Sequence, residues 1–482
     1  MSFFGDARFD GEYYGSLMGG LEASEVMLSW IRENTYDFRM ESEFYRKDDI
    51  KTLRKLQAMN HMTLGDGLAS LITDGTHFTP KYVDEGLPFL SALNIKKGYI
   101  DFEAGCQHIT QEQHNILCRR VRPREGDILM RKIGTGERLA CVVPKLEHEF
   151  SIFVSIALIR ANINPYYLSA FINSRYGQMQ LLRFNKGINQ PDLHLEDIRR
   201  LIVPLFSDEF YGRIEDITRR AMTARAASES SYALAQSILN DAIHFTPSPH
   251  SDSNTATVSF SQVFSSGRMD AEYFMPKYDD MLAQLKDCPT INDSCSIHGA
   301  NFIPQKGTQY SYIELANVGT SGNITGSTIA DGSELPTRAR RIVHAGQVII
   351  SSIEGSMQSC ALITPEYDGA LCSTGFYVID SDMYNPETLL LLFKSPAVQS
   401  LMKRGCSGTI LSAISESELR KIPLPYIDTQ TQQTISGHVK NSFNLRKESE
   451  RLISLAVKSI ETAIEYGENF RAVINEDIFT TK

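Results

Sequence analysis

Two short motifs in this sequence could take part in methyl-transfer or nucleotide chemistry. The segment NPYY (164–167) is close to the Asn-Pro-Pro-aromatic motif that grips a flipped adenine in methyltransferases, but it lacks the second proline. The segment GTG (134–136) is too short to be a nucleotide fingerprint, and the sequence has no P-loop for ATP. No His, Cys, Asp or Glu spacing matches a metal site, and none of the 8 cysteines forms a C-x-x-C pair. We therefore predict no catalytic centre, no metal and no bound cofactor.

Loops rich in Gly, Thr, Lys and Arg offer a different chemistry, which is the binding of a nucleic acid. Cations bind phosphates, whereas amide, hydroxyl and guanidinium groups can read base edges. Glycine-containing loops also tolerate a close approach of the backbone. In the first half of the chain the candidate contacts are Thr76, His77, Lys81, Arg131, Lys132, Thr135, Lys186, Asn189 and Gln190. Further positive charge comes from an arginine-rich segment with Arg119, Arg120, Arg122 and Arg124.

The second half of the chain carries corresponding candidates in fewer cationic loops. They are Lys306, Thr308, Gln309, Ser352, Ser356, Gln358, Lys403, Arg404 and Thr409. A separate cluster of candidate phosphate contacts consists of Arg338, Arg340 and Arg341. Because this half is poorer in positive charge, we expect its affinity for a nucleic acid to depend more on a partner.

The net charge of −10 opposes a free-standing DNA-binding protein, which usually has a basic surface. Either the protein binds no DNA, or its positive charge is local and a partner supplies the rest. No apolar run of about 18 residues predicts a membrane span, and the N-terminus does not resemble a signal peptide. The scattered cysteines are typical of reduced thiols, so we expect a cytoplasmic protein.

The sequence repeats itself at a shift of about 221 residues, a period that indicates duplicated domains. LEDIRRLIVP (195–204) aligns with ESELRKIPLP (416–425), and RMESEFY (39–45) aligns with RMDAEYF (268–274) at a slightly different shift. The repeat also places NPYY (164–167) over NPET (385–388), which could not grip a base. Both copies share only an Asn-Pro helix start, so the structural interpretation of this motif is favoured over the catalytic one.

Each half has one predicted plan of elements. It begins with the arginine-aromatic motif, which we expect to start a helix, and continues through short strands and turns. It ends in a proline-free helix of about 35 residues with a stripe of apolar and small side chains. Small stripe residues allow close approach, so we expect the two helices to pack antiparallel and relate the halves by a pseudo-twofold axis. The predicted fold class is α+β, with two tandem strand-rich domains and two long helices.

The order of these segments resembles the specificity subunit of type I restriction–modification systems. The resemblance is carried by TDGTHFTP (73–80), LPFLSALNIKKGYID (87–101), GDILMRKIGTGERLACVV (126–143) and 168–205, with counterparts at 310–325, 346–363 and 389–425. It covers nearly all of residues 39–475. The N-terminal extension departs from it, with a third copy of the opening motif, RFDGEYY (8–14), and the only tryptophan, Trp30.

The resemblance implies a non-catalytic protein with two target-recognition domains, each reading one half of a split double-stranded DNA site. It implies that the long helices act as a ruler and bind DNA methyltransferase subunits, and that a restriction or translocase subunit joins the complex. S-adenosylmethionine, ATP and Mg would belong to those partners. The expected boundaries are an extension at 1–38, recognition domains at 39–206 and 268–425, helices at 207–245 and 426–475, a linker at 246–267 and a tail at 476–482.

Two other functions stay open. A DNA adenine methyltransferase would need the NPYY segment to work without its second proline. A scaffold that binds only proteins would explain the acidic charge, but it leaves the Gly/Thr/Lys loops unexplained. Selection from random duplex DNA tests the predicted function against these alternatives, because we expect a DNA-reading specificity subunit to enrich two short sequence boxes at a fixed spacing.

Overall fold

A computed structural model describes residues 12, 16, 24–35, 38–187, 190–243, 255–408 and 410–469 of the chain. Helices and short strands alternate along it, which confirms the predicted α+β class. The chain forms two compact units: unit 1 is Met1–Thr223 with Glu448–Lys482, and unit 2 is Ala224–Lys447. In the part of the chain just defined, no helix is both long and apolar enough to cross a membrane.

Unit 1 contains a four-stranded antiparallel sheet in the order β2-β10-β7-β8. A second sheet has the order β6-β3-β9, in which β3 pairs antiparallel with β6 and parallel with β9. Two small pairs, β1-β11 and β4-β5, complete the strands. The strands are β1 (His61–Thr63), β2 (Thr73–Asp74), β3 (Leu87–Leu90), β4 (Ile95–Lys96), β5 (Tyr99–Ile100), β6 (Gln107–Ile109), β7 (Ile128–Arg131), β8 (Ala140–Val142), β9 (Ser151–Ile152), β10 (Ile156–Ile159) and β11 (Ile202–Pro204).

The described part of unit 1 has six short helices, and all except α4 contribute side chains to its main apolar core. They are α2 (Leu28–Asn34), α3 (Lys47–Ala58), α4 (Gln111–Leu117), α5 (Pro165–Ile172), α6 (Arg175–Arg183) and α7 (Leu195–Ile198). Helix α5 is predominantly apolar around its circumference, and seven of its eight residues are buried. Such a helix is stable only inside a core. The burial explains why the segment reads as a continuous apolar run.

Unit 2 repeats the strand order of both unit 1 sheets and adds one edge strand to the second, which agrees with the sequence repeat. Its first sheet has the order β12-β19-β16-β17, and its second has the order β14-β13-β18-β15, with β13 antiparallel to β14 and parallel to β18. The strands are β12 (Ser296–His298), β13 (Gln309–Ile313), β14 (Thr328–Asp331), β15 (Ala339–Ile342), β16 (Val348–Ser351), β17 (Cys360–Leu362), β18 (Leu371–Ser373), β19 (Phe376–Asp380), β20 (Cys406–Ser407) and β21 (Ala413–Ile414). The helices are α9 (Phe260–Ser266), α10 (Pro276–Gln284), α11 (Ile291–Ser294), α12 (Pro386–Lys394), α13 (Pro396–Gly405) and α14 (Glu416–Leu419).

The opening motif of each half does not start an α-helix directly. Its arginine, Arg39 or Arg268, stacks on an aromatic ring of the same motif and binds the end of a later helix, and we call this arrangement the arginine clamp. The motif forms a 3₁₀ turn, and the following α-helix begins at Lys47 in unit 1 and at Pro276 in unit 2. In unit 1, Arg39 stacks on the Phe44 ring and donates to the carbonyl of Arg183 at the end of α6. The equivalent Arg268 stacks on Tyr273 and donates to the end of α13. Each arginine places its positive charge at the C-terminus of a helix, α6 or α13, where the helix dipole stabilises a cation.

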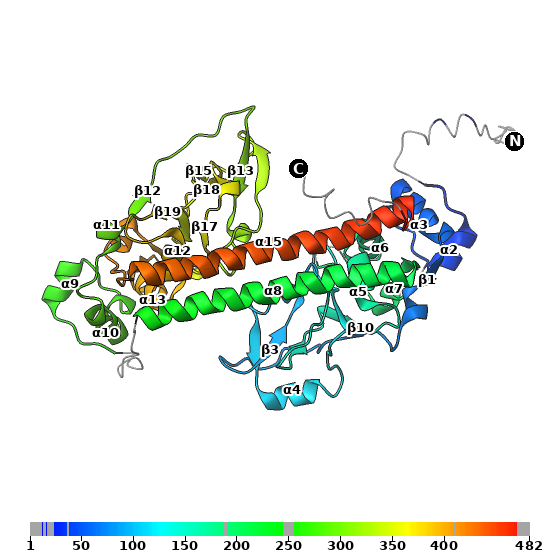
Figure 1. The fold of residues 1–482 in the computed structure, drawn as a ribbon, viewed down its shortest axis with the longest axis horizontal. Helices are drawn as coiled ribbons and strands as arrows, with labels where there is room; N and C mark the ends of the chain where they lie inside the picture. The colour runs from blue at the N-terminus through cyan, green and yellow to red at the C-terminus, as the bar shows by residue number, and fades with distance from the viewer. Residues whose placement is uncertain are drawn as a thin grey trace, which may run out of the picture. The chain divides into compact units, whose positions relative to one another are not determined.

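The two long helices are α8 (Asp208–Ile243) and α15 (Thr429–Tyr466), with 36 and 38 residues. Each contributes one half to each unit, and Figure 1 shows them side by side. In unit 2 they run antiparallel, because Ser228 bonds to Ser442 while Ser231, further along α8, bonds to the carbonyl of His438. In unit 1 the same stripes enter the core through Ile214, Ile217, Ala456 and Ile460. The predicted seam of small and apolar residues is confirmed within both units.

Candidate nucleic-acid interface

Three of the predicted unit 1 loops meet at the ends of β2 and β7. Ile133, which follows β7, forms a β-bridge with Asp192, and Lys186 bridges the same residue. The backbone N–H of Gly134 donates to the carbonyl of Pro191 at 3.0 Å, with a φ of 120° that favours glycine. The loops 131–135 and 186–192 are therefore one surface feature. Asp74, at the start of the loop 74–82, completes it through the ion pairs described next.

A cluster of charged groups surrounds the Asp74 carboxylate. Lys132 Nζ lies 3.0 Å from Asp192 Oδ1 and 3.6 Å from Asp74 Oδ2. On the other carboxylate oxygen, Arg120 Nη2 donates at 2.8 Å and His77 Nε2 lies at 3.3 Å. The Asp74 and Lys132 side chains are only 6% exposed, whereas those of His77 and Arg120 are 61% and 56% exposed. Buried charges therefore anchor exposed, hydrogen-bonding groups at the surface.

The backbone beside Asp74 is held tightly against the second sheet. Thr76 N donates to the carbonyl of Ile152, and Val154 N donates to the carbonyl of Thr76. A Cβ at Gly75 would lie 2.0 Å from the Ile152 carbonyl oxygen, so only glycine fits there. The glycine of this loop is thus needed for packing against β9, and the packing keeps Asp74 in place.

The structure divides the unit 1 candidates into two groups. The side chains of His77, Lys81, Thr135 and Gln190 are exposed. Thr76 is buried, Lys132 is in the ion pairs above, Arg131 donates to the carbonyl of Ile95, and Lys186 pairs with Asp197. Burial also lowers the pKa of Arg131. Asn189 lies outside the described residues.

The equivalent surface of unit 2 has the same backbone and different polar groups. Ile353 bridges Ala413, as Ile133 bridges Asp192. In the strand ladders, Leu129 pairs with Leu158 and Ile349 pairs with Val378, so β7 and β16 match and Ser352 is the counterpart of Lys132. Thr73 opposes Leu158 and His298 opposes Val378, so Gly299 is the counterpart of Asp74. The two aspartates and the lysine of the unit 1 cluster are therefore absent at the corresponding unit 2 positions, which hold Gly299, Ala413 and Ser352.

The unit 2 candidates also fall into two groups. Lys306, Thr308 and Gln309 are exposed at the start of β13, as are Arg338, Gln358 and Lys403 elsewhere. Bonds within the protein engage Ser352, Ser356, Arg340, Arg341 and Arg404. Arg404 in particular stacks 3.9 Å from the Tyr273 centroid and donates to the Tyr273 carbonyl, so it belongs to the opening-motif clamp. Thr409 lies outside the described residues.

Asp74 and Asp192 are the site residues that the search for cations missed. A carboxylate repels phosphate, so a search for nucleic-acid contacts passes over it. Asp74 stands immediately before Gly75 in the predicted loop, and this position in the sequence could have indicated a role for Asp74 in the site. Arg120 was recognised only as one of four clustered arginines.

The arginine-rich segment after α4 is tied to the second sheet of unit 1. Glu149 accepts hydrogen bonds from Arg122 and from the buried His114, and these bonds lower the pKa of its carboxyl. His114 also lies 3.0 Å from the Ser151 hydroxyl. His114 precedes Arg119 and Arg120 in the chain, and Arg122 follows them. The short segment that carries these two arginines is therefore anchored to Glu149 on both sides.

The NPYY segment is a helix cap in the structure. The Asn164 side chain accepts hydrogen bonds from the backbone N–H groups of Tyr166 and Tyr167, and Pro165 occupies the first helical position. Tyr167 is fully buried and donates to the carbonyl of Pro204. Asn385 caps α12 in the same way. These residues leave no open face on which a flipped base could stack.

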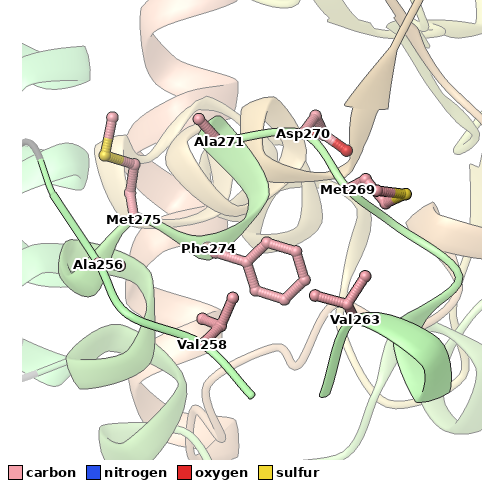
Figure 2. Close-up of a pocket in the computed structure, with 8 residues that line it drawn as sticks. All are labelled: Ala256, Val258, Val263, Met269, Asp270, Ala271, Phe274 and Met275. Carbon is pink, nitrogen blue, oxygen red and sulfur yellow. The ribbon is translucent and has the colours of Figure 1, made fainter. Parts of the chain in front are cut away.

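An apolar pocket of about 220 Å³ lies beside the clamp of unit 2. Figure 2 shows the Phe274 ring directed between Val258 and Val263, with Met269 and Met275 at the sides. Its one charged side chain, Asp270, binds Arg268. The pocket therefore lacks the convergent polar groups expected of a small-molecule site. The described residues also include no cluster of three or more groups that could hold a metal ion.

No protein-family model matches this sequence, and no curated protein matches it either. Similar solved structures include the type I restriction-modification S subunit from M. genitalium, with 12% identity, a TM-score of 0.38, and coverage of 85% of this chain and 96% of that chain. The HsdS subunit from Thermoanaerobacter tengcongensis is similar at 14% identity and a TM-score of 0.26, over 85% and 97%. At such TM-scores the function must be inferred from the chain's own residues.

Proposed function

We propose that this protein is the DNA-reading, non-catalytic specificity subunit of a type I restriction–modification complex. Each unit binds one half of a split double-stranded DNA site. The DNA methyltransferase subunits bind to the long helices, and a restriction or translocase subunit joins them. S-adenosylmethionine, ATP and Mg act in those partners.

One observation carries this proposal: the two units share a scaffold but differ in the polar groups at the same surface position. Scaffold contacts recur in both copies, such as the arginine clamp and the Asn-Pro cap. At the loop surface, by contrast, Lys132 is replaced by Ser352 and Asp192 by Ala413. A duplicated reader of two different half-sites needs this combination, because base identity is read by side chains on a common frame.

The exposed candidates are the proposed DNA contacts. In unit 1 they are His77, Lys81, Thr135 and Gln190, together with Asn189 from the sequence. In unit 2 they are Lys306, Thr308, Gln309, Arg338, Gln358 and Lys403, together with Thr409 from the sequence. We propose that the engaged residues, among them Lys132 and Arg404, shape the surface instead of contacting DNA.

The acidic net charge makes a partner part of the proposal. With a net charge of −10, the chain alone has little general attraction for phosphate. We therefore expect tight DNA binding only after the methyltransferase subunits have added their own surface. A protein-only scaffold would share the acidic charge, but it would not select DNA under any condition.

Selection from a random duplex pool tests the proposal. The full chain, with and without the methyltransferase subunit, should enrich two short boxes at a fixed spacing, more strongly with the subunit. Lys81→Ala should weaken one box and leave the other unchanged. An exposed lysine of α3, outside both the long helices and the candidate loops, provides the matched control variant, Lys51→Ala. If neither condition enriches a sequence, the proposed function is wrong.

A further inference from the structure

We propose that Arg120, oriented by Asp74, reads a guanine in the half-site bound by unit 1. This inference rests on the proposed function and adds to it the base that one side chain recognises. Guanine presents two acceptors, N7 and O6, in the major groove, and arginine is the side chain that can donate to both.

The first support is the combination of an exposed guanidinium and a buried carboxylate. The Arg120 side chain is 56% exposed, while the Asp74 side chain that it contacts is 6% exposed. Asp74 is held by the tight packing of Gly75 and by the ion pair with Lys132. A mobile surface arginine loses much rotamer freedom on binding, whereas one already held by a fixed carboxylate loses less. The contact therefore prepares Arg120 for a defined geometry.

The second support is the number of donors that Arg120 retains. A guanidinium has five N–H groups. Among the described residues, one hydrogen bond engages the Arg120 guanidinium, from Nη2 to Asp74 Oδ1 at 2.8 Å. Enough donors remain for the paired acceptors of guanine. Arg160 provides the contrast, because its Nε and Nη2 are both bound to Asp127 and Nη2 also donates to the carbonyl of Arg122.

The third support is the setting of Arg120 among other polar groups. His77 shares the same Asp74 oxygen and is 61% exposed. Lys132 joins Asp74 to Asp192, which lies in the same loop, 186–192, as the exposed Gln190. A base read by Arg120 would therefore lie next to further donors and acceptors. Phosphate contacts alone would not need this arrangement.

Unit 2 lacks the orienting carboxylate, so the guanine preference should be confined to unit 1. The counterpart of Asp74 is Gly299, and a Cβ built there would lie 3.4 Å from Arg341 Nη1. Arg341 instead donates to the carbonyl of His298 at 3.1 Å. A carbonyl of the main chain holds one donor but does not fix the guanidinium as an anion does.

The test measures the coupling between Arg120 and single guanines of the selected duplex. The full chain, with the methyltransferase subunit, is assayed on duplexes in which each guanine is replaced in turn by 7-deazaguanine, which lacks the N7 acceptor. For the native chain, one replacement in one box should weaken binding at least about fivefold. In Arg120→Lys, which keeps the charge and is exposed, the same replacement should cost less than about twofold.

Two further variants separate base reading from phosphate binding. Arg119→Ala removes an adjacent exposed cation, and it should weaken all duplexes equally while the guanine effect persists. Asp74→Asn keeps the shape of the side chain and should reduce the guanine effect, with thermal unfolding as the check of folding. If the native chain enriches two boxes but no guanine is coupled to Arg120, the inference is overturned and the proposed function stands. If no boxes are enriched, both fail.

Discussion

The arginine clamp of unit 2 leads to a prediction that separates structural from DNA-contacting cations. Arg404 resembles a DNA contact in the sequence, yet its guanidinium donates to the Tyr273 carbonyl at 3.0 Å and lies 3.9 Å from the ring centroid. A hydrogen bond from a charged group is worth about 1.5–3 kcal/mol, and a cation–π contact at a half-buried site about 0.5–1 kcal/mol. We expect Arg404→Met to lower the free energy of unfolding of unit 2 by about 2–4 kcal/mol. For a unit of this size, the expected fall in Tm is roughly 10 °C.

Thermal unfolding of the two units can be followed separately, because the only tryptophan of the sequence, Trp30, lies in unit 1. Trp30 contacts the Tyr45 ring in unit 1, so its fluorescence follows unit 1, while far-ultraviolet circular dichroism follows both units. Arg404→Met should move the circular-dichroism midpoint more than the fluorescence midpoint. The matched variant in unit 1, Arg183→Met, should show the reverse, because Arg183 stacks on Phe44 and donates twice to its carbonyl.

A DNA-binding measurement provides the refuting result. Lys403→Ala, at the exposed neighbour of Arg404, should weaken DNA binding and leave Tm unchanged within about 1 °C. Arg404→Met should do the opposite when binding is measured well below its Tm. If Arg404→Met left Tm unchanged and reduced DNA affinity as Lys403→Ala does, the clamp interpretation would be wrong.

Three other perturbations have defined outcomes. Ser442→Leu should destabilise the helix seam by about 1–3 kcal/mol, measured by denaturant unfolding, because Ser442 is fully buried against Ser228 and has no room for a larger side chain. Hydrogen bonds from Lys55 and Tyr176 lower the pKa of Glu465 below its ordinary 4.5, so its contribution to stability is complete above pH 4.5 and is lost as the pH falls through the lowered value. Glu465→Gln should therefore flatten the pH dependence of Tm there, and an unchanged profile would contradict this. Removing seven residues from both α8 and α15 keeps the seam register and shortens each helix by about 10 Å. The spacing of the selected boxes should then fall by about 3 base pairs. An unchanged spacing would exclude the hypothesis that the long helices set the distance between the two half-sites.

Local patterns predicted much of the fold. The repeat near 221 residues corresponds to two units whose first sheets have the same strand order and whose second sheets share three strands. The proline-free stripes became helices of 36 and 38 residues, against an expected length of about 35. The Asn-Pro pairs became helix caps in both copies. The arginine-aromatic motif was recognised as a domain start, although it proved to be a clamp that precedes the helix.

The sequence by itself determined the elements and their duplication, because helix periodicity, caps and turns depend on residues close together in the chain. Only the tertiary structure decided which cations are available at the surface. Lys132 is buried because Asp192 lies 60 residues away in the chain but 3.0 Å away in space, and Arg404 is engaged by Tyr273 across 131 residues. A buried charge requires such a partner, and no local pattern records where the partner will be. A contact of the same kind, between Arg120 and Asp74, distinguishes Arg120 from the three other arginines of its segment.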